Sequence, residues 1–206
     1  MKRPPVCTCE VLQTDANGDG LMDVALAEAR RIQVFPGTAR QFPFSAPMTY
    51  TFPQDLVDFT IADFRGQGQR ELAAALDSAS GSRLTYALIP NGGRGAVLTE
   101  SASSPLSMRP SQLIAADINA DGRAELMLLC KERHALTFIS GSSPNQSGQR
   151  HYGLGQQPQW LGISNVLGDA RSPLDVVVAD SMGRFDSVNG SVWILEGISA
   201  VSAASQ

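Results

Sequence analysis

Charged residues, aromatic residues and long apolar runs are all scarce in this sequence of 206 residues. Charged residues make up 17% and aromatic residues 6%, and the formal net charge is −4. A nucleic acid or an anionic membrane surface is attracted mainly by a basic face, which this composition does not supply. No apolar run reaches the roughly 18 residues of a membrane-spanning helix. The basic start MKRPPVCTCE lacks the apolar segment of a signal peptide. We therefore expect no nucleic-acid partner and no membrane insertion.

Cysteine and histidine are also rare, with three Cys and two His. Three thiols leave one unpaired under any disulfide scheme. Cys7 and Cys9 are close enough for a metal or redox pair, but incidental or buried thiols, including Cys130, are the interpretation we favour. Neither His134 nor His151 accompanies a nucleophile motif, and G-x-S-x-G, Walker, H-E-x-x-H and C-x-x-C patterns are missing. We expect a protein that is not an enzyme.

The sequence is instead rich in turn formers, with 19 Gly and 12 Pro, and it repeats one acidic segment. DANGDGLMD (residues 15–23) precedes the apolar run VALA, and DINADGRAE (117–125) precedes LMLL. An EF-hand loop begins in the same way but needs a bidentate Glu at its twelfth position. That position holds Leu26 in one copy and Leu128 in the other, and the last carboxylate stands at the ninth position, so an EF-hand is excluded.

Oxygen-bearing side chains alternate along both segments. In the first copy they are Asp15, Asn17, Asp19 and Asp23, and in the second copy they are Asp117, Asn119, Asp121 and Glu125. Alternating oxygens on a tightly turning loop converge on one point, as a hard cation such as Ca²⁺ requires. Gly20 and Gly122 follow the third of these side chains, where the chain must bend sharply.

Two fainter copies complete a series of four repeats. DFRGQGQRE (63–71) leads into LAAAL, and GDARSPLD (168–175) leads into VVVAD. The four closing acids recur at a period of about 50 residues, which is typical of one four-stranded propeller blade per repeat. The sequence thus predicts an all-β fold of four propeller-type blades, over approximately 6–53, 54–104, 110–155 and 158–206.

The loop D-x-N-x-D-G-x-x-D followed by an aliphatic strand resembles the FG-GAP/VCBS repeats of integrin-like β-propellers. This resemblance implies structural calcium ions that pin the turn between the first two strands of a blade. It implies a secreted or cell-surface module that binds a protein or glycan ligand, for example in cell adhesion. The alternative is a part of a propeller-fold carbohydrate-active enzyme, such as a polysaccharide lyase.

The resemblance implies a set of calcium ligands in two of the four loops. The first loop offers the side chains of Asp15, Asn17, Asp19 and Asp23 and the carbonyl of Leu21. The third loop offers the side chains of Asp117, Asn119, Asp121 and Glu125 and the carbonyl of Arg123.

The other two loops are expected to hold no metal. Arg65 and Gln67 replace ligands in the second loop, and the Arg65 guanidinium can pair with Asp63 and Glu71 in place of a cation. The fourth loop is shortened and stiffened by Pro173, so Asp169 and Asp175 are expected to cap turns.

Strand positions follow from the apolar pattern. LMDVALAEARR has a helix-forming composition, but the aligned LAAAL, LMLLC and VVVAD are short and uniformly apolar, which favours strands covered on both faces. Further strands are expected over 6–12, 31–37, 48–52, 56–63, 83–90, 95–101, 112–117, 135–141, 151–154, 160–167 and 191–197. Residues 101–111 are expected to form a connection, and the fourth strand of each blade is the least distinct.

Aromatic residues and blade closure complete the expectations. Trp160, Trp193, Tyr152 and Phe185 are candidates for a sugar-stacking face, although core or blade-interface positions are the more usual use of such residues. Nothing in the pattern supplies the strand exchange that closes a ring. We expect an incomplete propeller that gains blades from a longer chain or self-associates through its apolar end faces, which include residues 24–26 and 176–178.

Overall fold

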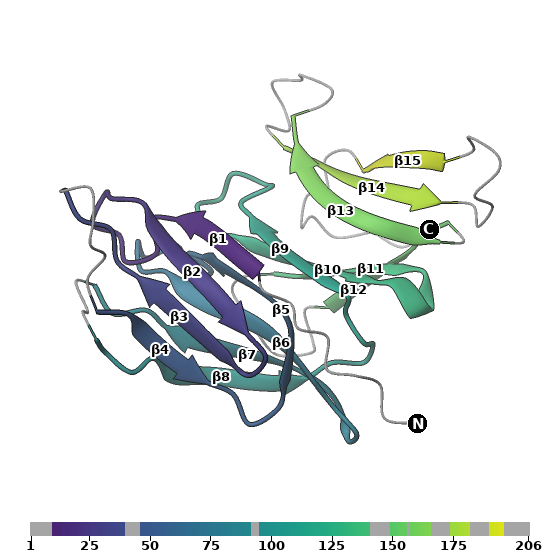
Figure 1. Ribbon diagram of the computed structural model, residues 1–206. Helices are drawn as coiled ribbons and strands as arrows, with labels where there is room; N and C mark the ends of the chain where they lie inside the picture. Colours follow the sequence, from purple (N-terminus) through teal and green to yellow (C-terminus); the bar gives the residue numbers. More distant parts are fainter. Residues whose placement is uncertain are drawn as a thin grey trace.

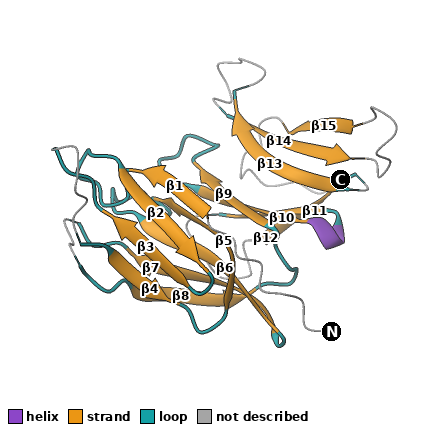
Figure 2. Cartoon of the chain, viewed as in Figure 1, coloured by secondary structure: helices purple, strands orange, loops and turns teal. Residues whose placement is uncertain are grey.

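The computed structural model describes residues 10–39, 46–91, 95–140, 149–155, 157–165, 174–181 and 190–195. These segments form fifteen β-strands and one 3-10 turn, η1 (Lys131–Arg133), so the chain is all-β (Figure 2). Within the described segments, no helix has the length and apolar character needed to cross a membrane.

The strands form four antiparallel sheets, each built from consecutive strands. The first sheet contains β1 (Glu10–Thr14), β2 (Asp23–Glu28), β3 (Arg31–Phe35) and β4 (Met48–Thr51). The second contains β5 (Asp55–Ala62), β6 (Glu71–Ser78), β7 (Gly81–Leu88) and β8 (Thr99–Pro105). The third contains β9 (Gln112–Ala116), β10 (Glu125–Cys130), β11 (Ala135–Ile139) and β12 (Gln149–Gly153). The fourth contains β13 (Pro158–Ser164), β14 (Asp175–Ser181) and β15 (Gly190–Leu195).

The structure confirms the strand after each acidic loop, including β2, whose composition alone favours a helix. Two boundaries are wrong. The first strand was expected over 6–12, but its described part, Glu10–Thr14, continues past residue 12; residues before 10 lie outside the described part. The expected connection over 101–111 contains most of β8, because its Ser side chains find partners in β7, such as Thr85 with Ser103.

Side chains alternate between the two faces of each sheet, and the second strand of each sheet shows which neighbour each face contacts. The residues that face the preceding sheet are Leu72, Ala74 and Leu76 in β6, Leu126, Leu128 and Cys130 in β10, and Val176 and Val178 in β14. The residues that face the following sheet are Ala25 and Ala27 in β2, Ala73 and Ala75 in β6, and Met127 and Leu129 in β10. The core therefore consists of three apolar clusters, each between consecutive sheets.

The sheets lie in a row whose inner edge is formed by the first strand of each sheet. β1 contacts β5, β5 contacts β9, and β9 contacts β13. Figure 1 shows the first sheet at one end of this row and the fourth at the other. None of the described apolar clusters joins the first sheet to the fourth. The arrangement is that of blades in a propeller, with the row left open.

A short segment covers the outer edge of the first sheet. Gly95, Ala96 and Leu98 exchange backbone hydrogen bonds with Ala46 and Thr49 at 3.0 to 3.2 Å. This segment runs parallel to β4 before the chain enters β8 of the second sheet. It was expected to belong to the fourth strand of the second blade. Instead it satisfies part of an exposed strand edge and ties two blades together.

Candidate functional site

The first three acidic loops lie at one end of the sheets, because each of them joins the first strand of its sheet to the second. Consecutive loops touch. The amide of Ala124 donates to the carbonyl of Asp63 at 2.9 Å. A Cβ added to Gly66 would lie 2.8 Å from Cγ of Arg123 and 3.0 Å from the carbonyl oxygen of Gly122. The loops thus form a continuous row, so a larger side chain in one loop would contact the next loop.

The first loop turns around Asp15. Its carboxylate accepts hydrogen bonds from the amides of Gly18, Asp19 and Gly20 at 2.8 to 3.1 Å. The side chains at the next two alternate positions also meet, since Asn17 Nδ2 donates to Asp19 Oδ2 at 3.0 Å. The positive φ of Gly20, 82°, accounts for glycine at the predicted sharp bend. The alternate side chains therefore gather on the inside of the turn.

The third loop repeats this geometry. Asp117 accepts from the amides of Asp121 and Gly122 at 3.0 and 2.8 Å, and Asn119 Nδ2 donates to Asp121 Oδ2 at 3.2 Å. Asn119 Nδ2 also donates to Glu125 Oε1 at 3.1 Å. The longer side chain of Glu125 thus reaches the alternate residues of its loop.

The residues predicted to bind through carbonyls occupy equivalent positions. The amide of Leu21 donates to Asp19 Oδ1 at 2.8 Å, and that of Arg123 donates to Asp121 Oδ1 at 2.9 Å. These bonds fix the peptide at the seventh position of each loop. Ligation by the two carbonyls stays a prediction.

Asp23 anchors the first loop through hydrogen bonds to backbone amides. It is fully buried as the first residue of β2. Its Oδ2 accepts from the amides of Ala16 and Asn17 at 2.9 and 3.1 Å, and its Oδ1 accepts from the amide of Gly37 at 2.6 Å. Burial raises the pKa of Asp23, and these three hydrogen bonds counteract the rise. A carboxylate accepts about four hydrogen bonds, so these three leave about one acceptor position of Asp23 open.

Glu125 is the equivalent anchor of the third loop. It is buried, and its Oε2 accepts from the amide of Ile118 at 3.1 Å. Burial, followed by the negative charges of Asp121 and Asp117, raises the pKa of Glu125 to about 7. The repulsion among these carboxylates is of the kind that a bound cation relieves.

The second loop has the same turn without the ligand set. Asp63 accepts from the amides of Arg65, Gln67 and Gly68 at 2.6 to 3.2 Å. Arg65 Nη2 lies 3.1 Å from Oε1 of the buried Glu71. The expected ion pair with Glu71 is confirmed. The expected pair with Asp63 is wrong, because the Asp63 carboxylate is taken up by backbone amides.

The contrast in charge between these loops is the clearest feature of the site. The second loop neutralises its closing acid with Arg65. The first and third loops each carry three carboxylates, and none of these acids takes part in the ion pairs of the described residues. Their donor atoms are all oxygens, as Ca²⁺ prefers, so the residue set fits this ion. Across the described segments, no three acidic, histidine or cysteine side chains are already arranged as a metal centre.

The remaining candidates from the sequence are dispersed. His134 is exposed with a φ of 51° at the end of η1, and His151 Nδ1 lies 2.9 Å from Thr137 Oγ1. Cys130 is buried, and burial raises the pKa of its thiol. Cys7, Cys9, Asp169, Pro173 and Phe185 and the side chain of Trp193 lie outside the described part.

Two of the aromatic candidates can be placed. Tyr152 packs edge-on against Phe138, with ring centroids 5.3 Å apart, as expected of a core residue. Trp160 is 53% exposed, so a core role for it is wrong. Its indole lies over Gly162, where a Cβ would overlap the ring. A glycine two residues along the strand from a tryptophan is the signal that could have indicated this arrangement.

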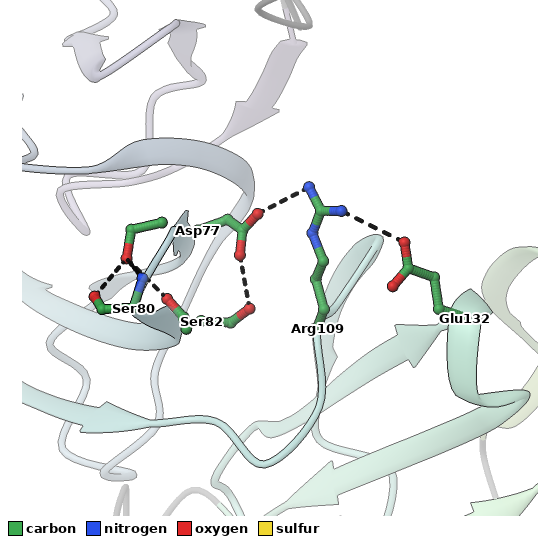
Figure 3. Close-up of polar contacts among 7 residues, drawn as sticks. Asp77, Ser80, Ser82, Arg109 and Glu132 are labelled. Carbon is green, nitrogen blue, oxygen red and sulfur yellow. Dashed lines mark hydrogen bonds and ion pairs between the residues drawn. The ribbon is translucent and has the colours of Figure 1, made fainter. Parts of the chain in front are cut away.

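A polar cluster between the second and third sheets was also missed. Arg109 Nη2 lies 2.8 Å from Asp77 Oδ2, and its Nη1 lies 3.4 Å from Glu132 Oε1 (Figure 3). Ser82 Oγ donates to the other oxygen of Asp77 at 2.9 Å (Figure 3). Asp77 lies near the end of β6 that is remote from the acidic loops. The cluster therefore links neighbouring sheets at their opposite end.

A carboxyl pair lies at the inner edge of the row, with Asp58 buried and Glu10 half-buried. Asp58 of β5 is buried and accepts from the amide of Leu113 of β9 at 2.6 Å. Glu10 of β1 hydrogen-bonds to Asp58. Burial, then this hydrogen bond and the charge of Asp58, raises the pKa of Glu10 to about 8. The contact joins first strands that are far apart in sequence, so spacing alone could not reveal it.

The four blade-like sheets place this chain among proteins with a β-propeller-like fold. BBS1N, in the crystal structure of its complex with ARL6DN, superposes with a TM-score of 0.56 at 12% identity, over 86% of this chain and 54% of that chain. A chain of the Tc holotoxin pore from Photorhabdus luminescens superposes with a TM-score of 0.52 at 16% identity, over 89% of this chain and 9% of that chain. At such identities the similarity concerns the fold alone. No protein-family model and no curated protein matches the sequence.

Proposed function

We propose that the chain is a calcium-stabilised, non-catalytic β-propeller module of the FG-GAP/VCBS type, secreted or on a cell surface, that binds a protein or glycan ligand. The observation that supports this most is the charge contrast among the loops. Two loops gather three carboxylates each without an ion-pair partner in the described segments, while the loop without the ligand set has Arg65.

In this proposal the calcium ions are structural. The first ion would be held by Asp15, Asn17, Asp19, Leu21 and Asp23. The second would be held by Asp117, Asn119, Asp121, Arg123 and Glu125. Each ion would supply positive charge to a loop that lacks it and fix the turn between two strands. Because consecutive loops touch, the whole row would be made rigid and could present a fixed surface to a ligand.

Calcium removal tests the metal claim. Extracellular modules bind calcium with dissociation constants of about 10⁻⁴ to 10⁻³ M. At about 2 mM free Ca²⁺ and a constant of about 10⁻⁴ M, each site adds about 1.8 kcal/mol. A chelator should therefore lower the melting temperature by about 4 to 7 °C per site. A melting curve that a chelator leaves unmoved would contradict the metal claim.

Two single substitutions test which loops cause the response to the chelator. Asp19→Ala and Asp121→Ala should each remove about one of two calcium ions in a calorimetric titration and about half of the chelator response. Gln67→Ala is the matched control, because Gln67 holds the equivalent position in the loop with Arg65. A control that loses as much of the response as Asp19→Ala would show that the effect is not specific to these loops.

Ligand class requires a separate experiment. A glycan array and a lyase assay on acidic polysaccharides should be run on the same preparation. Binding without turnover supports the module. Turnover would instead support the carbohydrate-active alternative and overturn the assignment as non-catalytic.

A further inference from the structure

The outward faces of the two end sheets carry exposed apolar side chains. On the first sheet this face, here called the first end face, comprises Val11, Val24, Leu26 and Phe35 together with the polar Gln13, Gln33 and Thr49. Val11 lies opposite Leu26, and Val24 lies opposite Phe35, so these side chains share one face. Val11 is 64% exposed and Leu26 is 37% exposed. Ala25, between them in β2, is buried against the second sheet.

The fourth sheet has a corresponding outward face, here called the fourth end face, comprising Trp160, Val177 and Ile194. Val177 lies opposite both Gly162, which carries the Trp160 indole, and Ile194. Val176 and Val178 are buried against the third sheet, so the expectation that 176–178 as a whole is exposed is wrong. Alternation leaves only Val177 of the three on the outside.

The two end faces are of opposite kinds. Along the second strand of each sheet, one set of alternate residues contacts the preceding sheet and the other set contacts the following sheet. The first end face contains the β2 residues equivalent to those that contact the preceding sheet in β6, β10 and β14. The fourth end face contains the β14 residues equivalent to those that contact the following sheet in β2, β6 and β10. Each of the three interfaces within the chain joins a face of the first kind to a face of the second kind. The two end faces are one face of each kind that no described sheet covers.

We propose that the fourth end face packs on the first end face of a second copy of this chain, and that two such contacts close a dimer of eight sheets. The contact continues an interface that the chain already forms three times between its own sheets. Eight blades are within the range of about four to eight found in propellers. Two-fold symmetry makes both contacts identical, so no end face is left to add further copies.

Light scattering after size exclusion measures the assembly. The parent chain should have a mass of about 44 kDa, twice the 21.9 kDa of one chain. Leu26→Glu and Trp160→Glu should each give a monomer, because each places a charge in both contacts of a symmetric dimer. Ala79→Glu is the control. Ala79 is exposed in the turn between β6 and β7 of the second sheet, away from both end faces, so this variant should stay dimeric.

Mixing the two monomeric variants tests which faces meet. The Leu26→Glu chain keeps an intact fourth end face, and the Trp160→Glu chain keeps an intact first end face. An equimolar mixture should therefore regain a heterodimer with one intact contact, which neither variant forms alone. A contact between two first end faces or between two fourth end faces would give no such rescue.

Several results would overturn the proposal. These are a parent chain that stays monomeric when concentrated, a concentration-dependent ladder of larger species, and a mixture without rescue. Circular dichroism should show that each variant is folded. If Leu26→Glu fails to fold, Val11→Glu on the same face replaces it. The assembly is measured with and without chelator, so that failure of this proposal can be distinguished from failure of the proposed calcium sites.

Discussion

At the scale of single residues, the acidic loops show which positions fix the turn. The first acid of each of the three described loops accepts hydrogen bonds from backbone amides, and it does so even in the loop where Arg65 stands at a ligand position. The turn therefore depends on this first acid, as in other turns stabilised by Asp side chains. The second loop keeps the turn with Gln67 at the fifth position, so the acids at that position in the other two loops, Asp19 and Asp121, are not required for the turn. This is consistent with their proposed use as ligands.

Ala120 is a strained residue in the third loop. It has a φ of 57°, whereas the equivalent positions of the first two loops are Gly18 and Gly66, with φ values of 74° and 65°. A left-handed conformation costs an L-residue about 1 to 2 kcal/mol. Ala120→Gly relieves this cost but makes the unfolded chain more flexible by about 0.4 to 1 kcal/mol.

The expected result for Ala120→Gly is a stabilisation of about 0.5 kcal/mol, or about 1 to 2 °C in melting temperature. Ala102→Gly is the control, since Ala102 lies in β8 and should lose about 0.5 to 1 kcal/mol on the same exchange. Equal losses at both positions would show that Ala120 is not strained.

Glu10 is predicted to make stability depend on pH. Its folded pKa is about 8, above its ordinary value of 4.5. Between these values the folded chain keeps a proton that the unfolded chain loses. The contribution of Glu10 to stability is therefore fully present below about pH 4.5 and is lost as the pH rises through about 8. The facing carboxyl is Asp58 of β5.

Glu10→Gln removes this titration while keeping a side chain of similar size. The melting temperature of the variant should fall less than that of the parent between about pH 5 and about pH 9. Gln13→Asn, a neutral exchange on the same strand, should leave the slope of the parent unchanged. Parallel curves for parent and Glu10→Gln would contradict the assignment.

At the scale of elements, the loop between the first two strands of the first three sheets has one backbone design and two ways of balancing charge. In the second loop the Arg65 guanidinium balances the buried Glu71. Ser101 Oγ donates to the same oxygen of Glu71 at 3.1 Å, so the pair is embedded in a small network. A cation would serve the same purpose in the first and third loops.

Two substitutions should convert the second loop into a calcium-binding loop. Arg65→Asp with Gln67→Asp gives it acids at the third and fifth positions, beside Asp63 and Glu71. The double variant should bind one more calcium ion than the parent in a calorimetric titration, because the turn itself is already formed. Arg65→Gln with Gln67→Asn, which removes the guanidinium without adding carboxylates, should bind no more than the parent. A folded double Asp variant with parental stoichiometry would refute the exchange of guanidinium for cation.

At the scale of the whole molecule, the structure is an open row of four sheets held by three apolar clusters. The polar contacts between neighbours lie at different levels. Asp63 and Ala124 meet at the loop end, Asp58 contacts β9 at the inner edge, and Arg109 bridges two sheets at the far end. The second and third sheets are thus joined at both ends and along their inner edge.

The repeat, the strands after the acidic loops and the side chains that lie in those loops can be predicted from the sequence alone. These features are local, because period, alternation and turn chemistry act within a few residues of one another. The same reasoning correctly rejected a helix for β2, since its aligned segments share one environment. It also placed Arg65 beside Glu71, whose positions are six residues apart along one loop.

Which face of each strand contacts which neighbouring sheet depends on the packing of the sheets and cannot be predicted from the sequence. Val176 and Val178 point to the third sheet and Val177 points away, although the sequence VVVAD does not distinguish them. β8 forms from a Ser-rich segment because β7 supplies partners for its hydroxyl groups. Glu10 meets Asp58 because the first strands of neighbouring sheets converge. Such contacts join residues from 18 to about 50 positions apart, and their energies depend on packing that no local pattern encodes.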